Sequence, residues 1–172
     1  MGRGKRWGVF FAIGVFLLPG CSEDPLAELK DAEEFTLYSI LGDPRPPPPG
    51  TPAPTSGENL HGWPVIGKTN ISDPQKRKAI VNSLQSAVAT GKSRIPMAKC
   101  FDPRHAIRVK RYGMTVDYLI CFECLRVRKY WFSWGAFTQG DDMSTKQAPQ
   151  KTLNFYLKEA GIALDPAMKG EI

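Results

Sequence analysis

The chain lacks a hydrophobic run long enough to cross a membrane. Its amino-terminal run of small and apolar residues, Trp7 to Leu18, ends at Pro19-Gly20, whereas a spanning helix needs roughly 20 apolar residues. The start also lacks the Ser or Thr at position 6 that N-myristoylation requires, because Arg6 stands there. A permanent transmembrane helix and a lipid on Gly2 are therefore not expected.

Concentrated charge and recognisable catalytic motifs are also missing. The chain has 23 Lys and Arg against 17 Asp and Glu, and three of the basic residues lie at positions 3, 5 and 6, before the apolar run. Without them 20 basic residues face 17 acidic ones, a net charge of +3, with no clustered basic face of the kind that binds nucleic acid. Gly91-Lys92-Ser93 is no phosphate-binding loop, since Ser86 replaces the glycine that the motif needs. No paired carboxylates or nucleophile motif stand out, so a non-catalytic role is favoured and nucleic acid is not an expected partner.

The first twenty-one residues have the layout of a secretory signal, with basic residues followed by a short apolar run. The run ends in Leu18-Pro19-Gly20-Cys21, which resembles the lipobox of bacterial lipoproteins, where a branched residue and a small one precede the modified cysteine. This resemblance implies cleavage before Cys21 and fatty acids such as palmitate on its thiol and amine. The implied location is the bacterial cell envelope, on the periplasmic or surface side. The implied partner is the membrane, with another envelope protein as a second candidate.

Composition divides the rest of the chain into a tether and one domain. Residues 21–33 are polar and acidic and are predicted to form a tether, with a short helix around Pro25 to Lys30 as the alternative. Residues 34–172 have the length of a single domain. A proline-rich stretch at 43–57 suits neither helix nor sheet and is predicted to be an exposed loop within that domain.

Hydrophobic periodicity predicts an α+β fold, a mainly antiparallel sheet with two helices packed on it. Alternating residues at 34–41 and a short apolar segment at 60–67 are expected to pair as strands across the proline-rich loop. A helix is expected from about Pro74 to Thr90, capped by Asp73 and stopped by Gly91. A last helix is expected over residues 150–160.

The most informative pattern is a hairpin formed by residues 101–109 and 115–124 around a turn at Tyr112-Gly113. Counting outward from this turn places His105 opposite Ile120 on an apolar face. The same count places Arg108 opposite Asp117 on the other face, as a cross-strand ion pair. Residues 126–132 are expected to continue or bend the strand, and residues 133–135 to turn the chain again. The aromatic side chains of residues 130–134 are expected in the core.

Three cysteines remain once Cys21 carries lipid, namely Cys100, Cys121 and Cys124. Outside the cytoplasm they suggest one disulfide with a spare thiol, or buried unpaired thiols. With His105 they also form a set of three sulfurs and a nitrogen that zinc accepts. Against zinc, the strand pattern around Cys121-x2-Cys124 is expected to point these two side chains to opposite faces. Against thiol redox catalysis, no helix follows Cys124.

Residues 100–108 and 120–124 are similar to segments of uncharacterised secreted bacterial proteins, a resemblance that implies no activity. The sequence therefore predicts a lipid-anchored envelope protein that acts as a non-catalytic binding or structural module without a cofactor. The alternative is a cysteine-centred protein that binds a metal, with zinc as the cofactor, or that performs thiol redox chemistry.

Overall fold

The computed structural model describes residues 24–42, 57–88 and 101–168. The signal region, all but the last residue of the proline-rich stretch at 43–57, the expected stop at Gly91 and Cys100 lie outside the described residues.

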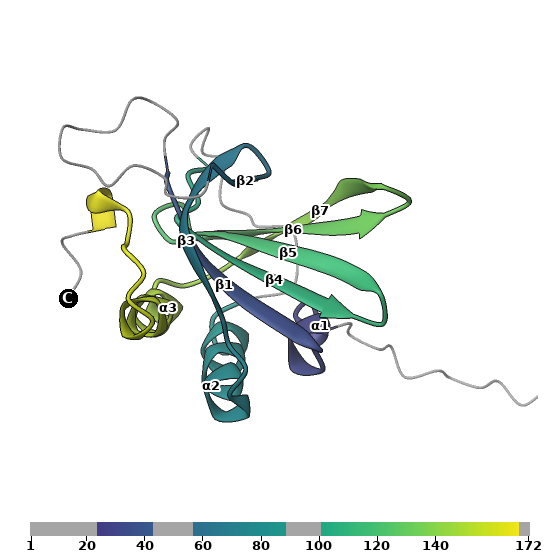
Figure 1. The fold of residues 1–172 in the computed structure, drawn as a ribbon, viewed down its shortest axis with the longest axis horizontal. Coiled ribbons are helices and arrows are strands. Elements are labelled where there is room, and N and C mark those ends of the chain that lie inside the picture. Colours follow the sequence, from purple (N-terminus) through teal and green to yellow (C-terminus); the bar gives the residue numbers. More distant parts are fainter. Residues whose placement is uncertain (1–23, 43–56, 89–100, 169–172) are drawn as a thin grey trace, which may run out of the picture.

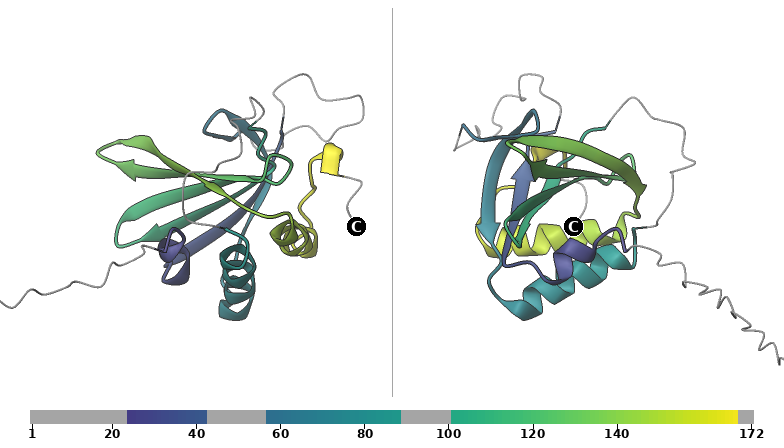
Figure 2. Two further views of the ribbon diagram at one scale, coloured as in Figure 1. Left: turned by 180° about the vertical axis from the view of Figure 1, so that it is seen from behind. Right: turned by 90° about the vertical axis from the view of Figure 1, so that its right-hand side faces the viewer.

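The described residues form mainly an antiparallel sheet with helices, as the predicted α+β class requires. Seven strands lie in the order β2-β3-β1-β4-β5-β6-β7, and every neighbouring pair is antiparallel. The sheet is strongly curled, and the α-helices lie on one side of it (Figures 1 and 2). In chain order the elements are α1 (Ala27–Lys30), β1 (Glu34–Ile40), β2 (Asn59–Leu60), β3 (Trp63–Asn70), α2 (Pro74–Gln85), β4 (His105–Arg111), β5 (Met114–Cys121), β6 (Arg126–Ser133), β7 (Ala136–Ser144), α3 (Ala148–Glu159) and the 3₁₀ helix η1 (Pro166–Met168).

The predicted β4–β5 hairpin is confirmed in its register. His105 faces Ile120 and Arg108 faces Asp117, with Arg108 Nε 2.7 Å from the Asp117 carboxylate. The turn residues Tyr112 and Gly113 have φ values of 48° and 74°, as a two-residue type I′ turn requires. Two independent features, the apolar alternation and the tight turn, specified the same register.

The expected pairing of the strands on either side of the proline-rich stretch is also confirmed, because β1 lies antiparallel to β3. Helix α2 begins as predicted, with the Asp73 carboxylate accepting the backbone N–H of Gln75 at 2.8 Å. It ends at Gln85 rather than near Thr90. The backbone N–H of Ala87 bonds to the carbonyl of Leu84, three residues earlier, as is common at a helix end. Within the described ranges, no helix is long and apolar enough to span a membrane.

The main hydrophobic core joins buried side chains of α1, α2 and α3 to one face of the sheet. It includes Leu26 and Leu29, which are 2% and 1% exposed. These two residues fall within the predicted tether of residues 21–33, so the folded domain starts earlier than expected. The short helix weighed as the alternative is present as α1, and burial of its apolar side chains holds it in place.

Candidate functional site

The two cysteines Cys121 and Cys124 lie on a tight turn rather than within one strand. Strand β5 ends at Cys121, residues 122–125 form the turn, and β6 returns antiparallel to β5. The expectation that these side chains point to opposite faces is therefore wrong, as is the expectation that residues 126–132 continue or bend the same strand, because they form the separate strand β6. Period-two alternation applies only to extended backbone, and Leu125, with a φ of 52°, takes the left-handed conformation that reverses the chain.

The turn brings the two thiols together. The backbone N–H of Cys124 donates to Cys121 Sγ at 3.2 Å, and the Cys124 thiol lies 3.9 Å from the Cys121 carbonyl oxygen. Cys121 is buried, Cys124 is half-buried, and neither forms a disulfide. A hydrogen bond from the Cys124 side chain lowers the pKa of Cys121 to about 7, assisted by the backbone N–H groups of Cys124 and Asp102 and opposed by burial. Cys121 is therefore substantially ionised near neutral pH, which is the form that attacks electrophiles and binds metals.

Of the four predicted zinc ligands, the structure describes His105, Cys121 and Cys124, and these three are not grouped as metal ligands. His105 is engaged elsewhere, since its Nε2 lies 2.7 Å from Asn154 Oδ1 and its ring packs edge-on against Phe122. In the part of the chain that the structure describes, no group of three or more His, Cys, Asp or Glu side chains is placed to hold a metal ion. Cys100 lies outside the described residues. Of the three predicted ligands that the structure describes, Cys121 and Cys124 are brought together.

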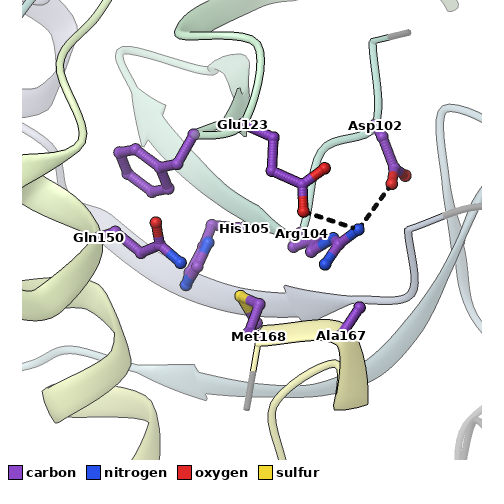
Figure 3. Close-up of a pocket in the computed structure, with 8 residues that line it drawn as sticks. Asp102, Arg104, His105, Glu123, Gln150, Ala167 and Met168 are labelled. Carbon is purple, nitrogen blue, oxygen red and sulfur yellow. Dashed lines mark hydrogen bonds and ion pairs between the residues drawn. The ribbon is translucent and has the colours of Figure 1, made fainter. Parts of the chain in front are cut away.

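A pocket of about 230 Å³ adjoins the cysteine turn, and the two residues between the cysteines form part of its wall (Figure 3). The remaining walls come from the start of β4, from α3 and from η1. Helix α3 and η1 therefore complete a site whose other half comes from the segment that leads into β4 and from the β5–β6 turn. The lining residues are Asp102, Arg104, His105, Phe122, Glu123, Gln150, Ala167 and Met168.

Arg104 is the central charge of this pocket. One of its terminal nitrogens, Nη2, lies 3.0 Å from Asp102 and 3.1 Å from Glu123, as the dashed lines in Figure 3 show. Its Nε lies 3.7 Å from the Asp165 carboxylate, too far for a hydrogen bond. Nε and Nη1 are buried and have no hydrogen-bond partner among the described residues. Arg104 therefore retains donor capacity inside a ring of carboxylates.

His105 is wholly buried in the pocket wall and uses only one of its ring nitrogens. Nε2 bonds to Asn154, whereas Nδ1 has no hydrogen-bond partner in the ranges that the structure describes. Burial lowers the pKa of His105 to about 4, with the Arg104 charge acting in the same direction and the Asn154 hydrogen bond opposing it. The ring is neutral at pH 7, and because Nε2 donates to the Asn154 oxygen, Nδ1 keeps a free lone pair. The sequence analysis placed His105 on an apolar face and in a candidate zinc site, and the structure shows a buried ring with one of its two nitrogens hydrogen-bonded.

A second polar cluster, of which the sequence analysis predicted the Arg108–Asp117 pair but not the His61 contact, lies on the other face of the sheet. His61 Nε2 lies 2.7 Å from the fully buried Asp117, which also binds Arg108. Burial alone would raise the pKa of Asp117, but hydrogen bonds from Arg108 and His61 lower it. The His61 ring stacks on Tyr130 with 3.9 Å between centroids. This cluster links the β2–β3 hairpin to the rest of the sheet, and the His61 contact had no sequence signal beyond the His61-Gly62 turn between the two strands.

The aromatic residues of β6 do not all enter the core as predicted. Tyr130 and Trp131 are half-buried, but Phe132 is 40% exposed and Trp134 is fully exposed. The prediction is wrong for Phe132 and Trp134, because β6 ends at Ser133 and the β6–β7 turn projects beyond the helices (Figure 1).

No protein-family model, curated protein or solved structure matches this chain.

Proposed function

We propose that this protein is a lipid-anchored component of a bacterial cell envelope that acts by binding. The observation that carries the proposal is the order of basic residues, apolar run and Leu18-Pro19-Gly20-Cys21. The fold is compatible with such an anchor, since Leu26 and Leu29 are already in the core. Only Ser22 and Glu23 separate Cys21 from Asp24, the first described residue, so a lipid on Cys21 would hold the domain close to the membrane.

The pocket beside the cysteine turn is the proposed binding site. Arg104 offers unused donors, His105 offers an unused acceptor, and Phe122 and Met168 provide apolar wall. These groups suit a small polar ligand that can both accept and donate hydrogen bonds. We also propose that α2 and α3 form a single layer packed on the sheet, since both contribute buried side chains to the same core.

Labelling with radioactive palmitate in a bacterial host tests the anchor. We expect the wild-type protein to incorporate label and to sediment with membranes. The variant Cys21→Ser should lose both properties, whereas the matched control Cys124→Ser should keep both. An unlabelled wild-type protein, or a labelled Cys21→Ser variant, would refute the assignment.

A second candidate function rests on the dithiol turn of Cys121 and Cys124. The structure removes the geometric objection to it, because the two thiols are adjacent and the pKa of Cys121 is lowered to about 7. Such a pair can lose two protons and two electrons to a disulfide acceptor, or can supply two thiolates to a soft metal ion.

Intact mass distinguishes these possibilities, measured under native and denaturing conditions, with and without reductant, and followed by thiol alkylation. A disulfide appears as a loss of two protons that the reductant reverses. Three alkylatable thiols with a native mass excess equal to one zinc ion would favour the metal-binding form. If Cys124→Ala lowers stability but changes neither metal content nor disulfide formation, the second candidate fails.

A further inference from the structure

Five large apolar side chains are exposed at one end of the sheet. Two lie at the β4–β5 turn and three at the β6–β7 turn. Strand pairing brings these turns together, because Thr115 at the start of β5 faces Phe132 near the end of β6. The exposed residues, which we call the hairpin-tip cluster, are Tyr112 (76% exposed), Met114 (49%), Phe132 (40%), Trp134 (103%) and Phe137 (38%).

The local backbone does not require aromatic residues at these positions. Tyr112 and Trp134 both occupy the first position of a two-residue turn, with φ values of 48° and 53°. Asn, Asp and Gly are favoured there, and a bulky side chain with positive φ is uncommon. Neither residue is buried by the fold. The cluster therefore exposes apolar area at a conformational cost that folding itself does not repay, which marks it as an interaction surface.

The chain segment closest to Cys21 lies at the same half of the sheet. Helix α1 lies beneath the half that carries the two turns (Figures 1 and 2). Asp31, just after α1, pairs with Arg111 at 3.1 Å, and the Glu33 carboxylate accepts the backbone N–H of Tyr112 at 3.1 Å. The β4–β5 turn is thus held directly against the chain that leads to the proposed anchor.

Simple lengths show that the cluster can reach the surface to which Cys21 would be attached. The three residue-to-residue steps from Cys21 to Asp24 span at most about 10 Å when extended. Lys129 Nζ lies 3.4 Å from the Pro25 carbonyl oxygen, which places Pro25 beneath the middle of β6. Trp134 follows five positions later, on the order of 17 Å along the strand direction. The hairpin tips therefore extend further than the tether can lift the domain.

We propose that the hairpin-tip cluster inserts into the headgroup region of the membrane that holds the lipid anchor. This proposal rests on the proposed anchoring through Cys21. Trp, Tyr and Met suit this region, because amphipathic rings and flexible apolar side chains partition to the boundary between headgroups and acyl chains. Neighbouring charges are largely paired, as Arg111 is with Asp31 and Lys110 with Glu34, so the contact does not require an anionic lipid. Anchor and cluster together fix the orientation of the domain on the membrane.

Quenching of tryptophan fluorescence by brominated phosphatidylcholine tests the proposal on the full mature lipoprotein, reconstituted in vesicles. The tryptophans of the mature chain are Trp63, Trp131 and Trp134, and the first two are partly buried. The spectrum of wild type minus that of Trp134→Ser isolates Trp134. Phe155→Ser is the matched control, since Phe155 is 60% exposed on α3, outside the cluster. Palmitate incorporation is measured on the same preparations.

We expect the Trp134 component to be blue-shifted and quenched by brominated lipid, and most of the quenching to be lost in Trp134→Ser but not in Phe155→Ser. A palmitate-labelled protein whose Trp134 stays unquenched overturns the membrane contact and leaves the anchor standing. Absence of palmitate overturns the anchor and the contact with it. A blue shift that follows protein density in the bilayer, without quenching by brominated lipid, would assign the cluster to a second copy of the chain.

Discussion

Acidification should destabilise the protein through His105. The unfolded chain binds a proton at this residue near its ordinary pKa of 6.5, whereas the buried ring binds one only near pH 4. Between these values the unfolded state holds the extra proton, so the free energy of unfolding falls as the pH falls. At about 1.4 kcal/mol per unit of pKa difference, the loss between pH 7 and pH 4 is about 3 kcal/mol.

The assay is urea unfolding at pH 7 and pH 4, for the wild type and for His105→Gln. Other groups that titrate in both proteins contribute equally to both, and their contribution cancels in the difference between them. We expect the stability of the wild type relative to His105→Gln to fall by about 3 kcal/mol between the two pH values. A difference that does not change with pH would refute the reasoning, because it would mean that the ring titrates alike in the folded and unfolded chain.

Three further predictions concern other parts of the molecule. Replacing Asp117 with Ala should lower the free energy of unfolding by about 3–5 kcal/mol in a urea titration, because it leaves the Arg108 guanidinium without its buried carboxylate partner. Asp142→Ala, which removes a partly exposed partner of Arg128, should lower it by under about 1 kcal/mol in the same assay. Alkylation of Cys121 by iodoacetamide should rise with a midpoint near pH 7, and the midpoint should move upward in Cys124→Ala, which removes the largest lowering contribution; an unchanged midpoint contradicts that cause. Leu29→Ala should lower the free energy of unfolding by about 2–5 kcal/mol in thermal or urea unfolding, since the side chain is 1% exposed. An unchanged stability would mean that residues 26–29 belong to the tether and not to the folded domain.

Predictions from sequence succeeded where local geometry and hydrophobic pattern agreed. The register of β4 and β5 followed from a two-residue turn at Tyr112-Gly113 and from period-two alternation on either side of it. The start of α2 followed from Asp73 and Pro74, which satisfy the requirements of a helix amino terminus by themselves. In both cases the physical cause acts within about ten residues of chain, a range over which a sequence can be read directly.

The candidate site was predicted only in part. Cys121 and Cys124 were singled out by their spacing, but apolar residues continue through the turn between them and concealed the reversal at Leu125. The carboxylates around Arg104 include that of Asp165, which lies 3.7 Å from Arg104 Nε in the fold but 61 positions later in the chain. No local pattern connects residues so far apart.

The sequence by itself therefore determined the register of the β4–β5 hairpin, the start of α2 and the expectation of an anchor, because short-range backbone and side-chain preferences specify them. Only the tertiary structure decided the pocket around Arg104 and His105, the His61–Asp117 pair and the exposure of Trp134. Burial and hydrogen-bond satisfaction are properties of how distant segments pack. Whether a polar atom in this pocket has a hydrogen-bond partner depends on how α3 and η1 pack against the start of β4. It does not depend on the residues that neighbour this atom in the sequence.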